Sequence, residues 1–152
     1  MIHGQYSSPF GPLKLTLRGT MLVELAFPPF DATETTHDRS FDTIFRQLDA
    51  YFSGQPHRFS LDIALRGTDF QLRVWQTLQQ IPWGETRSYS DIARAIGRPS
   101  ACRAVAQAIG RNPVGIVIPC HRVIGKDGSL TGFGGGLPLK RRLLELEGHR
   151  LG

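Results

Sequence analysis

The chain has 152 residues, 40% of them hydrophobic, which suits one domain or two small ones around a compact core. Its formal charge of +5, from 18 Lys and Arg residues against 13 Asp and Glu residues, favours an anionic partner such as nucleic acid without identifying one. No apolar stretch approaches the roughly 18 residues of a membrane span. Because residues 1–6 also lack the order of a signal peptide, we expect a cytoplasmic protein that does not bind a membrane.

The first 66 residues carry both strand and helix patterns. Apolar and polar residues alternate over 13–18, and an apolar run follows over 21–27, so these segments predict a β-hairpin with its turn between them. The polar stretch 31–39 predicts a surface loop. Alternation over 59–65 predicts another strand. Between the loop and this strand, one face of a predicted helix collects apolar residues, namely Phe41, Ile44, Phe45, Leu48, Tyr51 and Phe52.

Helical patterns dominate after Gly67, which we take as the domain boundary. The residues Thr68-Asp-Phe-Gln71 fit a capping box at the start of a helix that Pro-Trp-Gly at 82–84 ends. Ser88 and Asp91 offer a second capping box for a short helix ending near Gly97. Two helices are therefore predicted with defined starts.

A third helix follows, with Ser100 as its predicted N-cap and residues 101–110 as its body, so that 88–110 reads as helix, tight turn, helix. Val105 and Ile109 are expected to face the core. On pattern alone, a DNA-binding helix-turn-helix and an ordinary packed helix pair are equally good interpretations. The helix also has small residues that would allow close approach to another surface, namely Ala101, Ala104 and Ala108.

The sequence Ile-Pro-Cys-His-Arg-Val at 118–123 places Cys120 beside His121 and a basic residue. A neighbouring imidazole or cation favours the thiolate, the form that attacks electrophiles. Taken singly, the pair also has an ordinary explanation as a small core residue next to a surface histidine. The other cysteine is Cys102, and neither has a partner at zinc-site spacing, so both are expected as free thiols and no metal site is expected.

Further polar and glycine-rich features accompany this motif elsewhere in the chain. They are Tyr89, Arg103, Asn112-Pro113, the Gly-Phe-Gly-Gly-Gly run at 132–136, and Glu147. With these residues the chain resembles the O6-alkylguanine-DNA alkyltransferases, also called methylated-DNA–protein-cysteine methyltransferases. The resemblance runs from about residue 68 to residue 148 and is centred on 112–123. Before residue 68 it rests mainly on the order of elements.

The resemblance implies an α+β fold with two domains. Residues 1–66 are expected to form a ribonuclease-H-like domain, a small antiparallel sheet with a helix, whose role is structural. Residues 67–152 are expected to form a mainly helical domain that contains the helix-turn-helix and carries both DNA binding and alkyl transfer. No metal and no organic cofactor are implied.

The resemblance also implies a reaction centred on Cys120. Its sulfur would attack the alkyl carbon on guanine O6 in an SN2 displacement and keep the alkyl group as a thioether, so each molecule would act once. His121 would take the thiol proton through a water, Glu147 would hold and polarise the imidazole, and Asn112 would stabilise the local turn. These four residues form the expected catalytic set.

DNA binding is implied for the helix over 101–110, which in the family enters the minor groove. Ala101, Cys102 and Ala104 would lie at this contact, and Arg103 would fill the space left by an extruded nucleotide. Flipping is physically required, because the alkyl carbon is inaccessible to an in-line thiolate while the base stays stacked. Tyr89 would help rotate the lesion outward and donate to guanine N3.

The expected base-binding groups include backbone as well as side chains. The carbonyls of Cys120 and Val123 would accept from guanine N2, the Gly134 amide would donate toward O6, and Phe133 would supply an aromatic wall. The family commonly has tyrosine where this chain has Phe133, and some relatives have serine where it has Gly134. The preferred alkyl size and activity on O4-alkylthymine therefore stay open.

The implied partner is double-stranded DNA containing O6-alkylguanine, bound by a protein that we expect to be monomeric in solution. Cooperative assembly on DNA is left open. One alternative is an alkyltransferase-like protein that flips and marks lesions without accepting the alkyl group, but such proteins replace the acceptor cysteine, whereas this chain retains Cys120. Another is a cysteine hydrolase, but no recognised hydrolase signature accompanies the Cys-His pair.

Overall fold

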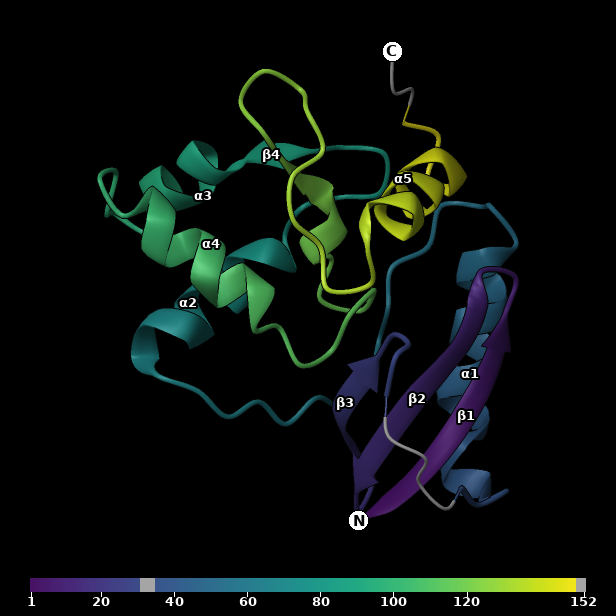
Figure 1. The fold of residues 1–152 in the computed structure, drawn as a ribbon. Coiled ribbons are helices and arrows are strands. Elements are labelled where there is room, and N and C mark those ends of the chain that lie inside the picture. The colour runs from purple at the N-terminus through teal and green to yellow at the C-terminus, as the bar shows by residue number, and fades with distance from the viewer. Residues whose placement is uncertain (31–34, 150–152) are drawn as a thin grey trace.

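The computed structural model describes residues 1–30 and 35–149 (Figure 1). It begins with a three-stranded antiparallel sheet in the order β1 (Ile2–Ser8), β2 (Gly11–Arg18), β3 (Met21–Ala26). The predicted hairpin is β2 and β3, and Gly19 in its turn has a φ of 61°, which glycine adopts without strain. Strand β1 was not predicted, because its sequence is largely polar and only Gly4 and Tyr6 in it are buried.

Helix α1 (Asp42–Phe52) lies against one face of this sheet (Figure 1). The helix has the predicted apolar face, and Ile44, Leu48 and Tyr51 on it are buried. The predicted surface loop lies partly outside the described residues, and its end forms a short 3-10 helix, η1 (Arg39–Phe41). Sheet and helix together make the small α+β unit predicted for the first half.

The strand predicted over residues 59–65 is wrong, because this segment makes only an isolated bridge between Ile63 and Leu22. The reason is the free edge of β3, which is shared between two segments. At Leu22 it pairs with Ile63, but at Leu25 it pairs with Val114 from the second half of the chain. The segment 59–65 is therefore left with room for only one pair, and β3 contacts the helical half directly.

The helical half contains α2 (Asp69–Leu78), β4 (Arg87–Ser88), α3 (Tyr89–Ala95) and α4 (Cys102–Gly110). The two predicted capping boxes are present: the Thr68 side chain accepts from the Gln71 amide, and the Ser88 side chain accepts from the Asp91 amide. Helices α3 and α4 form the predicted helix, tight turn and helix. They pack on α2, which lies behind α4 in Figure 1.

One expectation about α4 was wrong. Its N-cap is Ala101 rather than Ser100, because the Ala101 amide donates to the Arg98 carbonyl at 2.9 Å and continues the preceding turn by one residue. Ala108 is buried, and its small side chain lies where α4 packs on α2. The indole of Trp75 on α2 donates to the Ala108 carbonyl at 2.8 Å.

The last part of the chain brings a short 3-10 helix, η2 (Cys120–Arg122), and strand β5 (Val123–Ile124), which pairs in parallel with β4. Helix α5 (Leu137–Leu146) follows and ends next to α1 (Figure 1). One continuous hydrophobic core runs from the sheet through α2 and α4 to α5. Among the described residues, no helix is long and apolar enough to cross a membrane.

Candidate active site

The reactive cysteine predicted from the sequence, Cys120, begins η2 and is 8% exposed. The loop before it is pinned by Asn112, whose side-chain amide donates to the Ile118 carbonyl at 2.8 Å and whose side-chain oxygen accepts from the Val114 amide at 3.0 Å. This loop bends sharply, with Ile116 at a positive φ of 68°. Asn112 therefore fixes the backbone that presents the thiol.

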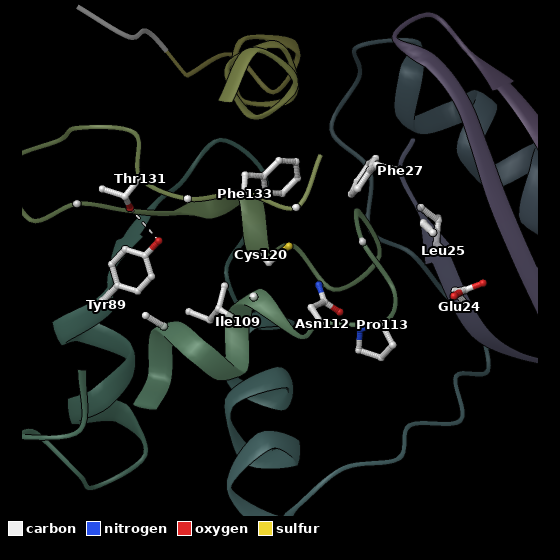
Figure 2. Close-up of a pocket in the computed structure, with 17 residues that line it drawn as sticks. Glu24, Leu25, Phe27, Tyr89, Ile109, Asn112, Pro113, Cys120, Thr131 and Phe133 are labelled. Carbon is white, nitrogen blue, oxygen red and sulfur yellow. Dashed lines mark hydrogen bonds between the residues drawn. The ribbon is translucent and has the colours of Figure 1, made fainter. Parts of the chain in front are cut away.

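Cys120 opens into a cavity of about 690 Å³ (Figure 2). Tyr89 lines one side of it, and Phe133 and Gly134 line another. The N-terminal domain also contributes, because Phe27 follows β3 into the wall and its ring centroid lies 5.3 Å from that of Phe133. Sequence reasoning missed Phe27, since the packing that brings it here depends on the contact between β3 and the loop before Cys120. The mostly apolar walls suit a flat aromatic ligand.

Two side chains of η2 bind a buried carboxylate. His121 is completely buried, and its Nε2 lies 2.6 Å from Oε2 of Glu147, just after α5. Arg122 Nε donates to Oε1 of the same carboxylate at 2.7 Å, and Tyr51 from α1 donates to Oε2 at 2.5 Å. Burial alone would raise the pKa of Glu147, but the partners His121 and Arg122 lower it to about 2. Glu147 is therefore ionised and accepts three bonds.

The protonation of His121 follows from these contacts. Burial lowers its pKa, although Glu147 opposes this, so the imidazole is neutral near pH 7. Because ionised Glu147 only accepts, Nε2 carries the proton and Nδ1 is the basic nitrogen. Nδ1 is buried and has no hydrogen-bond partner in the described part of the chain. His121 therefore has a nitrogen able to take a proton.

A buried lysine on α5 also influences the thiol. Burial raises the pKa of Cys120, while the Asn112 amide and the Lys140 ammonium oppose this by favouring the thiolate. Lys140 donates to the carbonyls of Val123 at 2.6 Å and Thr131 at 2.7 Å. Burial lowers its pKa to about 8. The sequence does carry a signal for it, because Lys140 lies three and four residues before two leucines that are buried on the same face of α5.

The predicted base-binding residues fall into two groups. Tyr89, Phe133 and Gly134 line the cavity, and a Cβ on Gly134 would meet no heavy atom of the described residues within 4 Å, so serine would fit there. The Tyr89 hydroxyl accepts from Thr131 at 2.8 Å, which leaves its own proton free to donate. Val123 lies outside the cavity wall formed by the described residues, and its carbonyl already accepts from Lys140.

The predicted DNA-contact residues lie together at the start of α4. Arg103 and Ala104 are exposed, while Ala101 and Cys102 are half-buried. Arg103 shares a helix face with Ala106, which lines the cavity. Arg103 thus lies one helical turn from the cavity lining, and none of the four residues is part of that lining. Over residues 1–30 and 35–149, no group of three or more His, Cys, Asp or Glu residues could hold a metal ion.

Comparison with known proteins agrees with this geometry. Residues 69–149 match the family model described as "6-O-methylguanine DNA methyltransferase, DNA binding domain", and residues 1–65 match its "ribonuclease-like domain". The chain belongs to this methyltransferase family. Its members repair DNA by moving an alkyl group to a cysteine of their own, so the protein is a methylated-DNA–protein-cysteine methyltransferase.

Relatives cover nearly the whole methyltransferase. The chain is 49% identical to a "Methylated-DNA--protein-cysteine methyltransferase" of Mycobacterium tuberculosis over 99% of its length and 94% of the relative's. It is 46% identical to one of Methanosarcina barkeri, covering 99% of both chains. The structure resembles that of Mycobacterium tuberculosis OGT in complex with DNA, with a TM-score of 0.90 and 50% identity over 97% of this chain and 92% of the other.

Proposed function

We propose that this methyltransferase takes the alkyl group from O6-alkylguanine in duplex DNA onto Cys120 and is used up in doing so. The observation that carries the proposal is the position of the thiol. Cys120 lines a mostly apolar cavity of about 690 Å³, and the next residue along the chain, His121, is buried and paired with Glu147. Covalent catalysis needs a nucleophile that has both a base close to it and a cavity that can hold the ligand.

The proposed reaction is one displacement. The Cys120 sulfur bonds to the alkyl carbon as the bond from that carbon to O6 breaks, and the electron pair stays with guanine. The thiol proton passes through a water to Nδ1 of His121, while Glu147 stabilises the imidazolium. Overall, the proton lost from the thiol balances the one that guanine gains at N1. A thioether is a poor leaving group, so no turnover follows.

The cavity supports specific roles for the residues around it. The free proton of Tyr89 would donate to guanine N3, and the Phe133 ring would pack on the base. The Gly134 amide would donate toward O6. The Cys120 and Val123 carbonyls would accept from guanine N2, the latter with its second lone pair, because its first bonds Lys140.

The exposed start of α4 supports minor-groove binding. Arg103 would enter the base stack, and the small side chains of Ala101, Cys102 and Ala104 would allow close approach to the groove. We divide the chain at residues 66 and 67, a division that the separate family models support. We further propose that the protein is a cytoplasmic monomer in solution.

The direct test is intact-protein mass spectrometry after incubation with duplex DNA containing O6-methylguanine, followed by peptide mapping. We expect a gain of one methyl group per molecule, located on Cys120. A methyl group on another residue would show that the acceptor is wrongly assigned. Tight DNA binding without any gain in mass would instead support the lesion-marking alternative.

Arg103→Ala should weaken repair of duplex DNA more than reaction with free O6-methylguanine base. Extrusion of a base costs a few kcal/mol, and insertion of Arg103 would offset part of this cost. Losing the arginine should therefore slow duplex repair by about tenfold to a hundredfold. Single-turnover rates on both substrates measure the difference. Arg46→Ala removes the same charge from an exposed position on α1 and should spare both rates. Equal losses on the two substrates in Arg103→Ala would reject the flipping role.

A further inference from the structure

The hydrogen bond from Tyr51 to Glu147 joins two residues 96 positions apart. Tyr51 belongs to α1 of the N-terminal domain and is fully buried. Its hydroxyl lies 2.5 Å from Oε2, the same carboxylate oxygen that pairs with Nε2 of His121. The N-terminal domain thus contacts the proposed proton relay directly, although the sequence predicts only a structural role for it.

Tyr51 acts here only as a donor. Burial and the adjacent Glu147 charge raise its pKa well above the ordinary value, so the phenol keeps its proton. Its bond stabilises negative charge on Oε2, which His121 also uses. Two donors that share one oxygen compete for its charge, so the bond from the phenol weakens the hydrogen bond between Glu147 and the imidazole.

The tyrosine ring is held firmly in this position. Its centroid lies 5.0 Å from that of Phe52, 5.6 Å from that of Phe59 and 5.4 Å from that of Trp83. These aromatic contacts fix where the hydroxyl points. They involve only the ring, so phenylalanine at this position would keep them and lose the bond to Glu147 alone.

We propose that Tyr51 is a positioning residue for alkyl transfer, through which the N-terminal domain orients Glu147 and limits how strongly it polarises His121. This inference rests on the proposed function, because it assumes that His121 takes the Cys120 proton. Tyr51 acts through Glu147 and does not touch the substrate cavity within the described residues. It therefore alters the proton transfer step without altering binding of the base.

The test is the pH dependence of the single-turnover transfer rate in Tyr51→Phe. Without the phenol, Glu147 polarises His121 more strongly, the imidazole becomes more basic, and the acidic limb of the profile should move to higher pH by about half a unit to one unit. The plateau rate should also fall severalfold, because the carboxylate loses one of its fixed contacts. DNA affinity should stay at the wild-type value.

The matched control is Tyr6→Phe. Tyr6 donates to the Asp49 carboxylate at 2.6 Å, which is the same kind of bond that Tyr51 makes to Glu147. Asp49 lies on α1, as Tyr51 does, but it has no part in the proposed relay. Loss of the bond from Tyr6 should leave the pH profile unmoved. An unmoved profile in Tyr51→Phe, or an equal shift in Tyr6→Phe, would overturn the proposal, even if stability falls.

A second probe keeps the Tyr51 hydroxyl and changes only its acidity. Incorporating 3-fluorotyrosine at position 51 alone gives a more acidic phenol that donates more strongly to Glu147, so the acidic limb should move to lower pH. An unchanged limb would overturn the inference. Mass spectrometry of the wild type distinguishes failure of the proposed function from failure of the role of Tyr51. If Cys120 is not alkylated, the proposed function fails. If Cys120 is alkylated but the pH profiles do not move, only the role of Tyr51 is rejected.

Discussion

Cys120→Ala is expected to abolish alkyl transfer completely and to leave binding of lesion-containing duplex DNA at the wild-type level. The thiol is the proposed acceptor, whereas the proposed groove contacts lie on α4 and the proposed base contacts use other side chains and backbone groups, so none of them involves the sulfur. Alanine keeps the small volume of the site, so the loop and cavity should survive the change. Intact mass measured beside fluorescence anisotropy with an O6-methylguanine duplex checks both parts of the expectation.

Cys102→Ala is the matched control, because it removes the other free thiol. Cys102 is half-buried on α4, where its sulfur lies 3.6 Å from the Ser90 hydroxyl and outside the cavity wall formed by the described residues. This variant should gain one methyl group as the wild type does. A mass gain in Cys120→Ala, or its loss in Cys102→Ala with DNA binding intact, would contradict the assignment of the acceptor.

Local sequence signals predicted much of the fold because the interactions behind them are local. The capping boxes at Thr68 and Ser88 involve residues three positions apart, and the hairpin turn depends on Gly19. The wrong strand expectation concerns a tertiary contact. Residues 59–65 alternate like a strand, but the edge they would pair with is shared with Val114. The bond from Trp75 to the Ala108 carbonyl, between residues 33 positions apart, is likewise not visible in the local sequence.

In the candidate site too, the sequence shows local features but not the contacts between distant residues. The adjacency of Cys120 and His121 is visible in the sequence, and Glu147 was assigned from the family resemblance, since nothing local connects it to the histidine. Tyr51 looks like an ordinary apolar position on the face of α1, and only the tertiary structure shows where its hydroxyl points. Lys140 could have been found as a cation on an otherwise apolar helix face.

Glu147→Gln should disable alkyl transfer and destabilise the fold together. A neutral amide cannot stabilise the imidazolium of His121, and loss of general base catalysis should slow transfer by about a hundredfold or more. The same change leaves Arg122 buried without its charged partner, which typically costs about 3–5 kcal/mol. Single-turnover rates and urea unfolding measure the two effects separately. Glu145→Gln, an exposed change two residues earlier, should leave both near the wild-type values.

The acid dependence of stability tests the same carboxylate without changing its neighbours. The pKa of Glu147 lies at about 2 in the folded protein, below its ordinary value of 4.5. A carboxyl group with a lowered folded pKa stabilises the fold above its unfolded pKa and loses this contribution as pH falls through the folded value. Wild-type protein should therefore lose about 3 kcal/mol from this group between pH 4.5 and 2. Urea unfolding across this range should show that loss in the wild type and in Glu145→Gln but not in Glu147→Gln, and parallel curves for all three would mean that Glu147 is not held ionised by its partners.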